Sequence, residues 1–262
     1  MPHIEVRNVS LVYDTPAGEV PGVAGVSFDI EASQFLCIVG PSGCGKSTLL
    51  NVIAGFLAPT AGEIRIGGKA VSGHGSDRGV VFQDFAQLFP WRTALGNVTF
   101  GLEMRGVGKV EREEIALAQL KLVKLEKFVK SYPHHLSGGM QQRVAIARAL
   151  AYNPSVLLMD EPFAALDALT RDDMQRLLAE VWRETRKTVV YVTHNVGGGG
   201  LSRGSRRGDD AASRHGEDRG AHSPAAAARS AQRRISAISE IAAASSRPRR
   251  GCASNAIGMK HT

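Results

Sequence analysis

The sequence lacks several features that would assign it to common classes of protein. No stretch of its 262 residues approaches the roughly 18 uninterrupted apolar residues that a transmembrane helix needs. The first seven residues lack the apolar core of a signal peptide, so we expect the chain to remain in the cytosol. The cysteines, Cys37, Cys44 and Cys252, are odd in number and have no metal-ligand spacing. Neither a disulfide framework nor a structural zinc site is indicated.

Net charge is missing from the first three-quarters of the chain. Residues 1–195 contain 20 basic and 20 acidic side chains, whereas residues 196–262 contain 12 basic and 5 acidic ones and account for the whole +7. The basic stretch has no Phe, Tyr or Trp and is rich in Gly, Ala, Ser and Arg, a composition that predicts a disordered tail. Because the preceding part is neutral overall, we predict no nucleic-acid partner.

What the sequence does contain is a glycine-rich turn, GPSGCGKST, between an apolar strand at residues 35–39 and a predicted helix. Its glycines allow backbone conformations that a Cβ forbids, and the N–H groups and helix dipole favour a bound anion. In this context, a lysine can reach the β- and γ-phosphates of a nucleotide, and the following hydroxyl can ligate Mg²⁺. A glycine-rich turn without a ligand is the alternative. The predicted binding residues are Gly40, Pro41, Ser42, Gly43, Cys44, Gly45, Lys46, Ser47 and Thr48.

The pattern of apolar residues also predicts the other elements. We expect strands at residues 4–14, 23–30, 62–66, 79–83, 156–160 and 188–193, and amphipathic helices at residues 111–130 and 170–186. Tyr13 lies at the end of the first strand, where its ring could stack on an adenine base or simply pack against the protein. The loop of residues 83–91, from Gln83 to Trp91, contains large apolar residues and a proline. It either closes a core or presents an anchor to a partner protein, and we favour the anchor.

Two acidic side chains follow a buried strand. Asp160, at the end of the strand, can hold Mg²⁺ through water, and Glu161 can accept a proton from an attacking water, a role worth about 10²–10⁴ in rate. A surface turn with two acids is the alternative, but the apolar run leading into it argues against that. A Ser-Gly-Gly turn (Ser137, Gly138, Gly139) opens a helix and is either a second anion site or an ordinary cap. Two half-sites suggest a nucleotide clamped between subunits.

The order of these motifs resembles the ATP-binding subunit of an ABC transporter. The residues that carry the resemblance are GPSGCGKST, Gln83, LSGGMQQR, VLLMDEP, ALD and His194. Among importers, the chain is most similar to the nitrate, sulfonate, taurine and bicarbonate group, through GVVFQ, LFPW, NVTFGL, DEPFAALDALTR and VYVTHN. The resemblance implies an α/β fold of the P-loop NTPase class, with a RecA-like core, an antiparallel β subdomain and a helical subdomain at about residues 88–152.

The resemblance also implies a role for each matching residue. Tyr13 would stack on adenine, Gln83 would sense Mg²⁺ and the attacking water, and Asp160 and Ser47 would hold the metal. Glu161 would be the general base, assisted by Lys46, Gln83 and His194 at the γ-phosphate. The Ser-Gly-Gly turn and Asp167 would complete the site of an opposite subunit, so that two copies enclose two ATP molecules. The loop of residues 83–91 would contact permease subunits on the cytoplasmic face of the membrane, and a solute-binding protein would act indirectly.

The resemblance covers residues 1–195 and then stops at a run of four glycines. Codons for residues 197–211 can be chosen so that reading one nucleotide later gives EEAVYLADRVVVMT followed by proline, which is what the family would show there. A frameshift near Val196 is therefore one hypothesis, and a basic tail that binds lipid or nucleic acid is the other. Eleven arginines against one lysine, without an amphipathic pattern, favour the frameshift.

Three functions follow as alternatives. The first is an ATPase subunit of an importer for a small anion. The second is a catalytically impaired ATP-binding product of a frameshifted gene, less stable than its relatives. The third is a soluble ABC ATPase, which the LFPW loop and the neutral charge of residues 1–195 disfavour.

Overall fold

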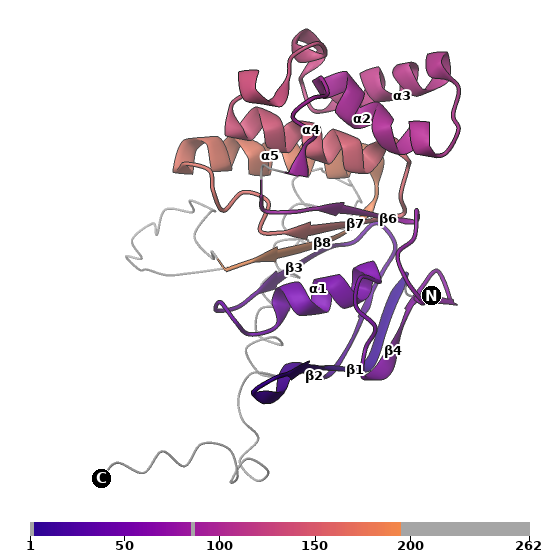
Figure 1. Cartoon of the computed structure of the whole chain (residues 1–262), viewed down its shortest axis with the longest axis vertical. Helices are drawn as coiled ribbons and strands as arrows, with labels where there is room; N and C mark the ends of the chain where they lie inside the picture. The colour runs from indigo at the N-terminus through magenta and orange to yellow at the C-terminus, as the bar shows by residue number, and fades with distance from the viewer. Residues whose placement is uncertain (1–2, 85–86, 195–262) are drawn as a thin grey trace, which may run out of the picture. The chain divides into compact units, whose positions relative to one another are not determined.

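The computed structural model describes residues 3–84 and 87–194, which form two β-sheets and the helices around them (Figure 1). One sheet is antiparallel with the strand order β2-β1-β4-β5, and the other is parallel with the order β3-β8-β7-β6. The strands are β1 (Ile4–Thr15), β2 (Gly18–Ile30), β3 (Phe35–Val39), β4 (Ala61–Ile66), β5 (Lys69–Ala70), β6 (Arg78–Val81), β7 (Val156–Asp160) and β8 (Thr188–Thr193). The helices are α1 (Lys46–Ala54), α2 (Ala94–Met104), α3 (Lys109–Leu122), α4 (Gly138–Ala151) and α5 (Ala168–Thr185), with short 3₁₀ turns η2 (Glu126–Phe128) and η3 (Pro133–His135).

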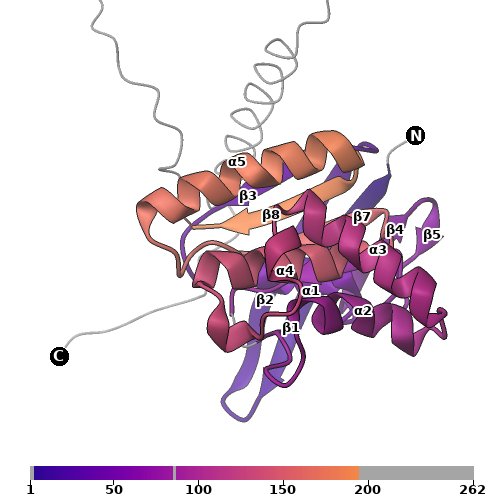
Figure 2. The same ribbon diagram turned by 90° about the horizontal axis from the view of Figure 1, so that it is seen from above.

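The parallel sheet brings the ends of three strands to one edge. Strands β7 and β8 are buried along nearly their whole length, as expected for parallel strands covered on both faces. The register pairs Val39 of β3 with Thr193 of β8, and Val192 of β8 with Asp160 of β7. The loops that follow these strands therefore start side by side. Helix α1 lies on one face of this sheet, and α4 and α5 lie on the other (Figures 1 and 2).

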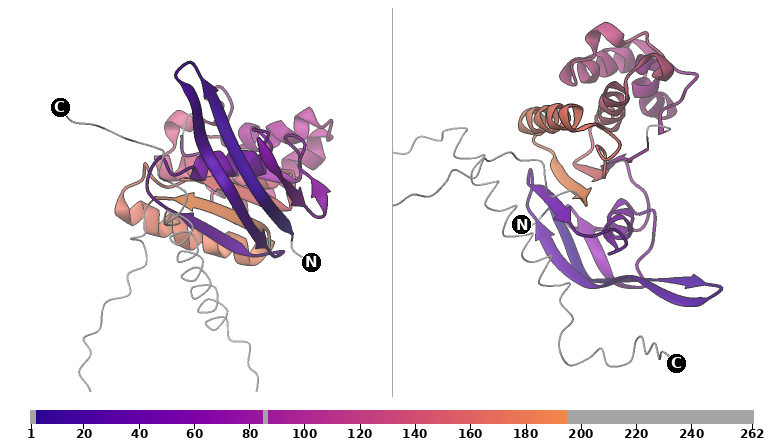
Figure 3. Two further views of the ribbon diagram at one scale, coloured as in Figure 1. Left: turned by 90° about the horizontal axis from the view of Figure 1, so that it is seen from below. Right: turned by 90° about the vertical axis from the view of Figure 1, so that its left-hand side faces the viewer.

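The antiparallel sheet is more exposed to solvent than the parallel sheet, and one of its strands is longer than the sequence predicts. Strands β1 and β2 form a hairpin whose last pair is Thr15 and Gly18, and its tip projects away from the rest of the fold (Figure 3). Most of β2 is at least partly exposed, so its first residues have no apolar pattern. Backbone pairing to β1, rather than burial, extends β2 to Gly18, and the predicted start at residue 23 is wrong.

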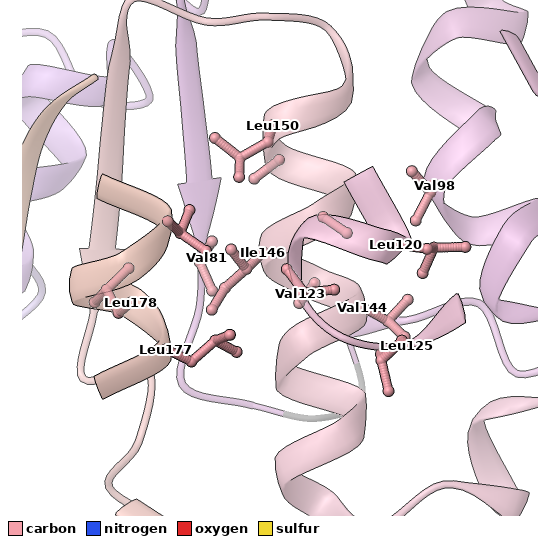
Figure 4. Packing of buried hydrophobic residues seen from close by; sticks show 14 of the residues in the cluster. Val81, Val98, Leu120, Val123, Leu125, Val144, Ile146, Leu150, Leu177 and Leu178 are labelled. Atoms are coloured by element: carbon pink, nitrogen blue, oxygen red, sulfur yellow. The ribbon is translucent and has the colours of Figure 1, made fainter. Parts of the chain in front are cut away.

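The main hydrophobic core lies between the parallel sheet and helices α2 to α5 (Figure 4). Helix α4 contributes most to it, because Val144, Ile146 and Leu150 all face packed neighbours. The burial of such apolar surface stabilises the fold by about 25 cal/mol per Å².

The prediction of one helix over residues 111–130 is wrong, because α3 ends at Leu122. Lys124 takes a left-handed conformation with φ of 59°. The N–H of Leu125 donates to the carbonyl of Leu120 at 2.8 Å, and that of Lys124 donates to Lys121 at 2.9 Å. This is a Schellman cap in which Lys124 occupies the left-handed position that glycine usually takes. The buried Leu120 and Leu125 are the apolar pair that accompanies such a cap.

Strand β3 pairs with β8 and, within the described residues, with no strand on its other side. Phe35, Cys37, Ile38 and Val39 are only partly buried. Burial nevertheless raises the pKa of the Cys37 thiol to about 11. The predicted disordered tail and the frameshift concern residues 196–262, which lie outside the described part of the chain. In the described part, no helix is both long and apolar enough to span a membrane.

Candidate nucleotide-binding site

The glycine-rich turn leads into α1 without a side-chain cap. Gly45 is the N-cap of α1 and has φ of 90°, in the left-handed region. A Cβ on Gly45 would lie 2.1 Å from the carbonyl oxygen of Gly22, so both the conformation and the close approach require glycine. No side chain accepts the first N–H groups of α1. These donors, together with the helix dipole, are suited to a phosphate.

Lys46 is held over this turn. It is 7% exposed, and its Nζ donates to the carbonyls of Gly40 at 2.9 Å and Pro41 at 2.7 Å. The Sγ of Cys44 lies 3.8 Å from the same nitrogen. An ammonium that is buried and bonded only to neutral oxygens is well placed to pair with an anion.

Asp160 and Ser47 meet at the end of β7. The Ser47 hydroxyl donates to Asp160 Oδ1 at 3.0 Å. Burial raises the pKa of Asp160, the hydrogen bond from Ser47 lowers it, and the neighbouring Glu161 charge raises it again. Two oxygen ligands from the protein and the rest from phosphates and water are what Mg²⁺ usually takes. In the described residues, no group of three His, Cys, Asp or Glu side chains is placed to hold a metal ion.

Glu161 and His194 form a pair beside Asp160. His194 Nδ1 lies 2.6 Å from Glu161 Oε2, so the tautomer with a proton on Nδ1 satisfies the bond. The Glu161 side chain is 14% exposed, whereas that of His194 is 47% exposed. Glu161 has φ of 45°, and its N–H donates to the Val192 carbonyl at 2.9 Å. This unusual backbone directs the carboxylate toward the phosphate loop, and strained positions of this kind cluster at functional sites.

One cleft of about 590 Å³ joins these groups. Of the residues that the sequence predicts, it is lined by Tyr13, Ser42, Gly43, Gly45, Lys46, Ser47, Thr48, Gln83, Glu161 and His194. Gly40, Pro41 and Cys44 reach the cleft through Lys46, and Asp160 reaches it through Ser47. Tyr13 is 37% exposed, and its hydroxyl lies 3.1 Å from Thr48 Oγ1, so its ring forms one side of the cleft.

The Ser-Gly-Gly corner (Ser137, Gly138, Gly139) is not among the residues that line this cleft. Ser137 caps α4, accepting the Met140 N–H at 3.3 Å. Gly139 packs so tightly that a Cβ would lie 2.8 Å from Thr170 Cγ2. Asp167 caps α5 by accepting the Thr170 N–H at 3.0 Å, and that backbone hydrogen bond lowers its pKa. The corner and Asp167 therefore form a second group, on the starts of α4 and α5.

Sequence reasoning missed two buried polar residues, Asn97 and Gln142, and the partly buried Arg148, which together hold the loop after β6. Asn97 is fully buried and bonds four backbone groups, among them the N–H and carbonyl of Phe89. Gln142 donates to the carbonyl of Phe82 at 3.0 Å, and Arg148 donates to that of Gln87 at 2.7 Å. Their partners are backbone groups that tertiary packing brings near, so the sequence carried no signal for them.

The loop closes part of the core and also leaves one large aromatic side chain exposed. Leu88 is 3% exposed and joins the core, whereas Trp91 is 71% exposed. Phe89 packs edge-to-face against Phe100, with ring centroids 4.6 Å apart. Residues 85 and 86 lie outside the described part of the chain. The fixed backbone and the exposed indole are typical of a docking element.

An uncapped helix start with a buried lysine, beside a serine–aspartate pair and a glutamate–histidine pair, defines a P-loop ATPase of the nucleotide-binding cassette class. The chain belongs to the ABC transporter family: the family model described as "ABC transporter" matches residues 23–164. The fold and the ATP-hydrolysing activity of that class apply to this chain, and ATP is its nucleotide.

Curated relatives are about half identical over the matched part. The chain is 54% identical over 194 residues to the taurine import ATP-binding protein TauB of Rhizobium johnstonii, covering 74% of each chain. It is 51% identical over 193 residues to an uncharacterized ABC transporter ATP-binding protein, MJ0412, of Methanocaldococcus jannaschii, covering 74% of this chain and 72% of that one.

Solved structures give the same result. The dimeric structure of MJ0796, a bacterial ABC transporter cassette, has a TM-score of 0.65 and 40% identity, over 74% of this chain and 88% of that one. A second dimeric structure of MJ0796, in a post-hydrolysis state bound to ADP and Pi, gives the same values.

Proposed function

We propose that this chain binds and hydrolyses ATP to energise a membrane importer of a small anion such as nitrate, a sulfonate or taurine. The observation that carries the proposal is the single cleft that joins Lys46, the Ser47–Asp160 pair and the Glu161–His194 pair. The taurine import relatives support the choice of an anionic or zwitterionic solute. The solute itself would be selected by other polypeptides.

Each group in the cleft has one task. The uncapped N–H groups of α1 and the Lys46 ammonium bind and orient the phosphates, which a lysine reaches in P-loop enzymes. Ser47 and Asp160 hold Mg²⁺, which supplies charge neutralisation between the phosphates. Glu161 accepts the proton of the attacking water as its oxygen adds to the γ-phosphorus and the bond from that phosphorus to the bridging oxygen breaks, so that ADP leaves with the bridging oxygen and phosphate is released. His194 fixes the Glu161 carboxylate and faces the same phosphate, while Tyr13 offers its ring to adenine.

We propose that residues 1–195 form the nucleotide-binding domain, with the helical subdomain at about residues 88–152, and that two copies enclose two ATP molecules. The Ser-Gly-Gly corner supports this, because the start of a helix favours an anion and this one lies outside the cleft of its own chain. The dimeric MJ0796 structures are a precedent for such pairing. Gln83 and exposed Trp91 would contact a permease on the cytoplasmic face of the membrane, and a solute-binding protein would take part indirectly.

Two measurements test the proposal: whether the chain retains labelled ATP, and whether its molecular mass in the presence of ATP is that of a pair of chains. The unaltered full chain should retain ATP with Mg²⁺ and pair at saturating nucleotide, whereas Lys46→Ala should do neither. Lys127→Ala, an exposed lysine on η2, is the matched control and should behave like the unaltered chain. If the unaltered chain neither retained ATP nor paired, the proposal would be wrong.

A second candidate function is an impaired product of a frameshifted gene. The unpaired side of β3 within the described residues supports it, because a half-exposed apolar edge is where further strands would add. On this proposal, the chain unfolds at lower temperature than its relatives and hydrolyses ATP poorly while still binding it. Sequencing the coding DNA decides the origin: the hypothesis fails if no single-base change near codon 196 restores the EEAVYLADRVVVMT frame.

A further inference from the structure

One buried side chain connects the two loops that carry Gln83 and Glu161. Gln142, on α4, is fully buried. Its Nε2 donates to the carbonyl of Phe82 at 3.0 Å and also to the carbonyl of Pro162. Phe82 directly precedes Gln83, and Pro162 directly follows Glu161. A single amide is therefore bonded to the backbone beside both of these cleft residues.

The contacts of this amide fix its orientation. The carbonyls of Phe82 and Pro162 need a donor, so the Nε2 group of Gln142 must face them. On the opposite side, Oε1 accepts a hydrogen bond from Nε2 of Gln87 at 3.0 Å. A reversed amide would place an oxygen against two carbonyl oxygens. An apolar side chain of the same size would leave buried polar groups without this partner, which is costly.

A second amide holds the Phe82 end of this bridge. Nε2 of Gln87 donates to the Phe82 carbonyl at 2.9 Å, and its Oε1 accepts the Phe82 N–H at 3.3 Å. The side chain of Gln87 thus pairs with both backbone groups of Phe82, as a neighbouring strand would. Because Gln87 also donates to Gln142, the two amides form one hydrogen-bond network around the same backbone.

The Pro162 end is important because the backbone of Glu161 has an unusual conformation. Its φ of 45° lies in the left-handed region, which is unfavourable for a residue with a Cβ. Such a conformation persists only where the surrounding structure determines it. The Glu161 N–H donates to the carbonyl of Val192, and the carbonyl of the following Pro162 accepts from Gln142. Loss of the second bond should let this turn relax and move the carboxylate.

Helix α4 also connects the network to the Ser-Gly-Gly corner. Ser137 is the N-cap of α4, and Gln142 lies about one and a half turns further along the same helix. Arg148, another turn and a half on, donates to the carbonyl of Gln87 at 2.7 Å. The helix is therefore hydrogen-bonded to the loop after β6 at two points, and to the turn after β7 at one.

We propose that Gln142 is a positioning residue for ATP hydrolysis. Through the backbone beside them, it holds Gln83 and Glu161 in the arrangement that hydrolysis needs, and it touches neither ATP nor the attacking water. This inference rests on the proposed roles of those two residues. Because α4 begins at the corner that would face the nucleotide of a second copy, Gln142 also links pairing to hydrolysis.

The Kd for Mg²⁺–ATP and the kcat of phosphate release, both measured on the full chain, test this role. Gln142→Met keeps the length of the side chain but removes the amide. It should lower kcat by about tenfold or more, because misplacing a reacting group by about 1 Å can cost 10²-fold. It should change Kd by less than about twofold, since Lys46 is untouched. An unchanged kcat would overturn the inference, whereas the unaltered chain's own ATP retention and hydrolysis report on the proposed function.

The ring resonances of His194 give a readout that needs no turnover. Nδ1 of His194 lies 2.6 Å from Oε2 of Glu161, so these resonances report where the carboxylate lies. In the nucleotide-free chain at constant pH, Gln142→Met should shift them and should leave those of the exposed His74 unchanged. If the His194 resonances did not shift, Gln142 would not position Glu161, however slowly the chain hydrolysed ATP.

Two control variants separate positioning from a loss of stability. Leu150→Ala, a buried change on the same helix, should lower Tm but leave kcat of the folded chain and the His194 resonances unchanged. Gln175→Met, on α5, controls for the exchange of Gln for Met. If Leu150→Ala reproduced the low kcat and the shifted resonances, the effect of Gln142→Met would be one of stability alone, and the inference would be wrong.

Gln87→Met removes the other amide of the network from a partly exposed position, so it gives an independent test if the Gln142 variant does not fold. It should lower kcat by a smaller factor and again leave Kd for ATP unchanged. In the double variant, the two losses should be less than additive in free energy, because both changes break one network. Full additivity would contradict a shared network.

Discussion

The starts of helices α1 and α4 are both glycine-rich, but they satisfy their backbone donors in different ways. At α1 the N-cap is Gly45, in the left-handed region and without a side-chain hydrogen bond. At α4 the N-cap is Ser137, whose hydroxyl accepts the Met140 N–H. The first helix therefore depends on an outside anion, whereas the second is complete within its own chain. The N–H groups at the start of α1 are therefore available to an anion, and we propose that the start of α4 instead faces the nucleotide of a second copy.

The charges follow the same division. Near α1, the structure gathers the buried Lys46, the partly buried Asp160 and the Glu161–His194 pair. At the N-cap of α5 lies Asp167, which is exposed and whose pKa is lowered by its capping hydrogen bond. We propose that the α1 side carries the reacting groups and that the α4–α5 side recognises the nucleotide of a second copy. Experiments that remove one side at a time can test this division.

The largest effect is expected from Glu161→Gln. The amide keeps the shape of the side chain but cannot accept the proton of the attacking water, so hydrolysis should fall by about 10²–10⁴-fold. ATP retention and ATP-dependent pairing should persist, since Lys46 and Ser47 are unchanged. Phosphate release and labelled ATP retention are the measurements, and Glu184→Gln, exposed on α5, is the control. Equal hydrolysis by Glu161→Gln and the unaltered chain would remove the general base from the proposal.

A smaller effect is expected from Asp160→Asn, which should stabilise the ligand-free chain but weaken its binding of Mg²⁺–ATP. Burial raises the pKa of Asp160 above its unfolded value. Between the unfolded and the folded pKa of Asp160, the folded state binds more protons than the unfolded state. The free energy of unfolding therefore falls as pH rises through this range, and ionised Asp160 opposes folding at neutral pH. The Asn variant should melt at a higher temperature without ligand and show a weaker dependence of Tm on pH.

The same variant should lose the additional stabilisation that Mg²⁺–ATP gives the unaltered chain, because a metal ligand is gone. Thermal melts with and without Mg²⁺–ATP make both measurements. Asp172→Asn, an exposed position on α5, is the control for loss of one charge. If, without ligand, Asp160→Asn had a lower Tm than the unaltered chain, ionised Asp160 would stabilise the fold. The inference that its burial opposes folding would then be wrong.

These differences also explain which parts the sequence predicted. The phosphate loop, the Asp160–Glu161 turn and His194 each follow a strand, and parallel pairing brings the ends of those strands together. The contiguous motifs, together with the rule that parallel strands end at one edge of the sheet, were therefore sufficient to predict this site. Asn97 and Gln142 were missed, because their partners are carbonyls made available by tertiary packing and leave no periodic signal.

Two errors in secondary structure have the same origin. Helix α3 ends at Leu122, but the apolar pattern of the sequence continues beyond it. The Schellman cap at Lys124 contains no glycine, so the sequence gave no sign that the helix ends there. Strand β2 begins at Gly18 because it pairs with β1 across the hairpin, where its side chains face water. In both cases, backbone hydrogen bonds decided the boundary, and side-chain periodicity does not report them.

The smallest expected effect separates the two roles of Ser137. Ser137→Ala removes the cap of α4 and should lower the free energy of unfolding by about 1 kcal/mol in urea denaturation. It should leave ATP retention by the single chain unchanged, because Ser137 does not line the cleft. Ser137→Asn restores a capping oxygen and so should recover the stability. If the hydroxyl also contacts the γ-phosphate held by the other copy, Ser137→Asn should still hydrolyse ATP slowly and pair weakly. Full recovery of hydrolysis by Ser137→Asn would mean that the corner acts only as a helix cap, and the contrast between α1 and α4 would then be one of folding alone.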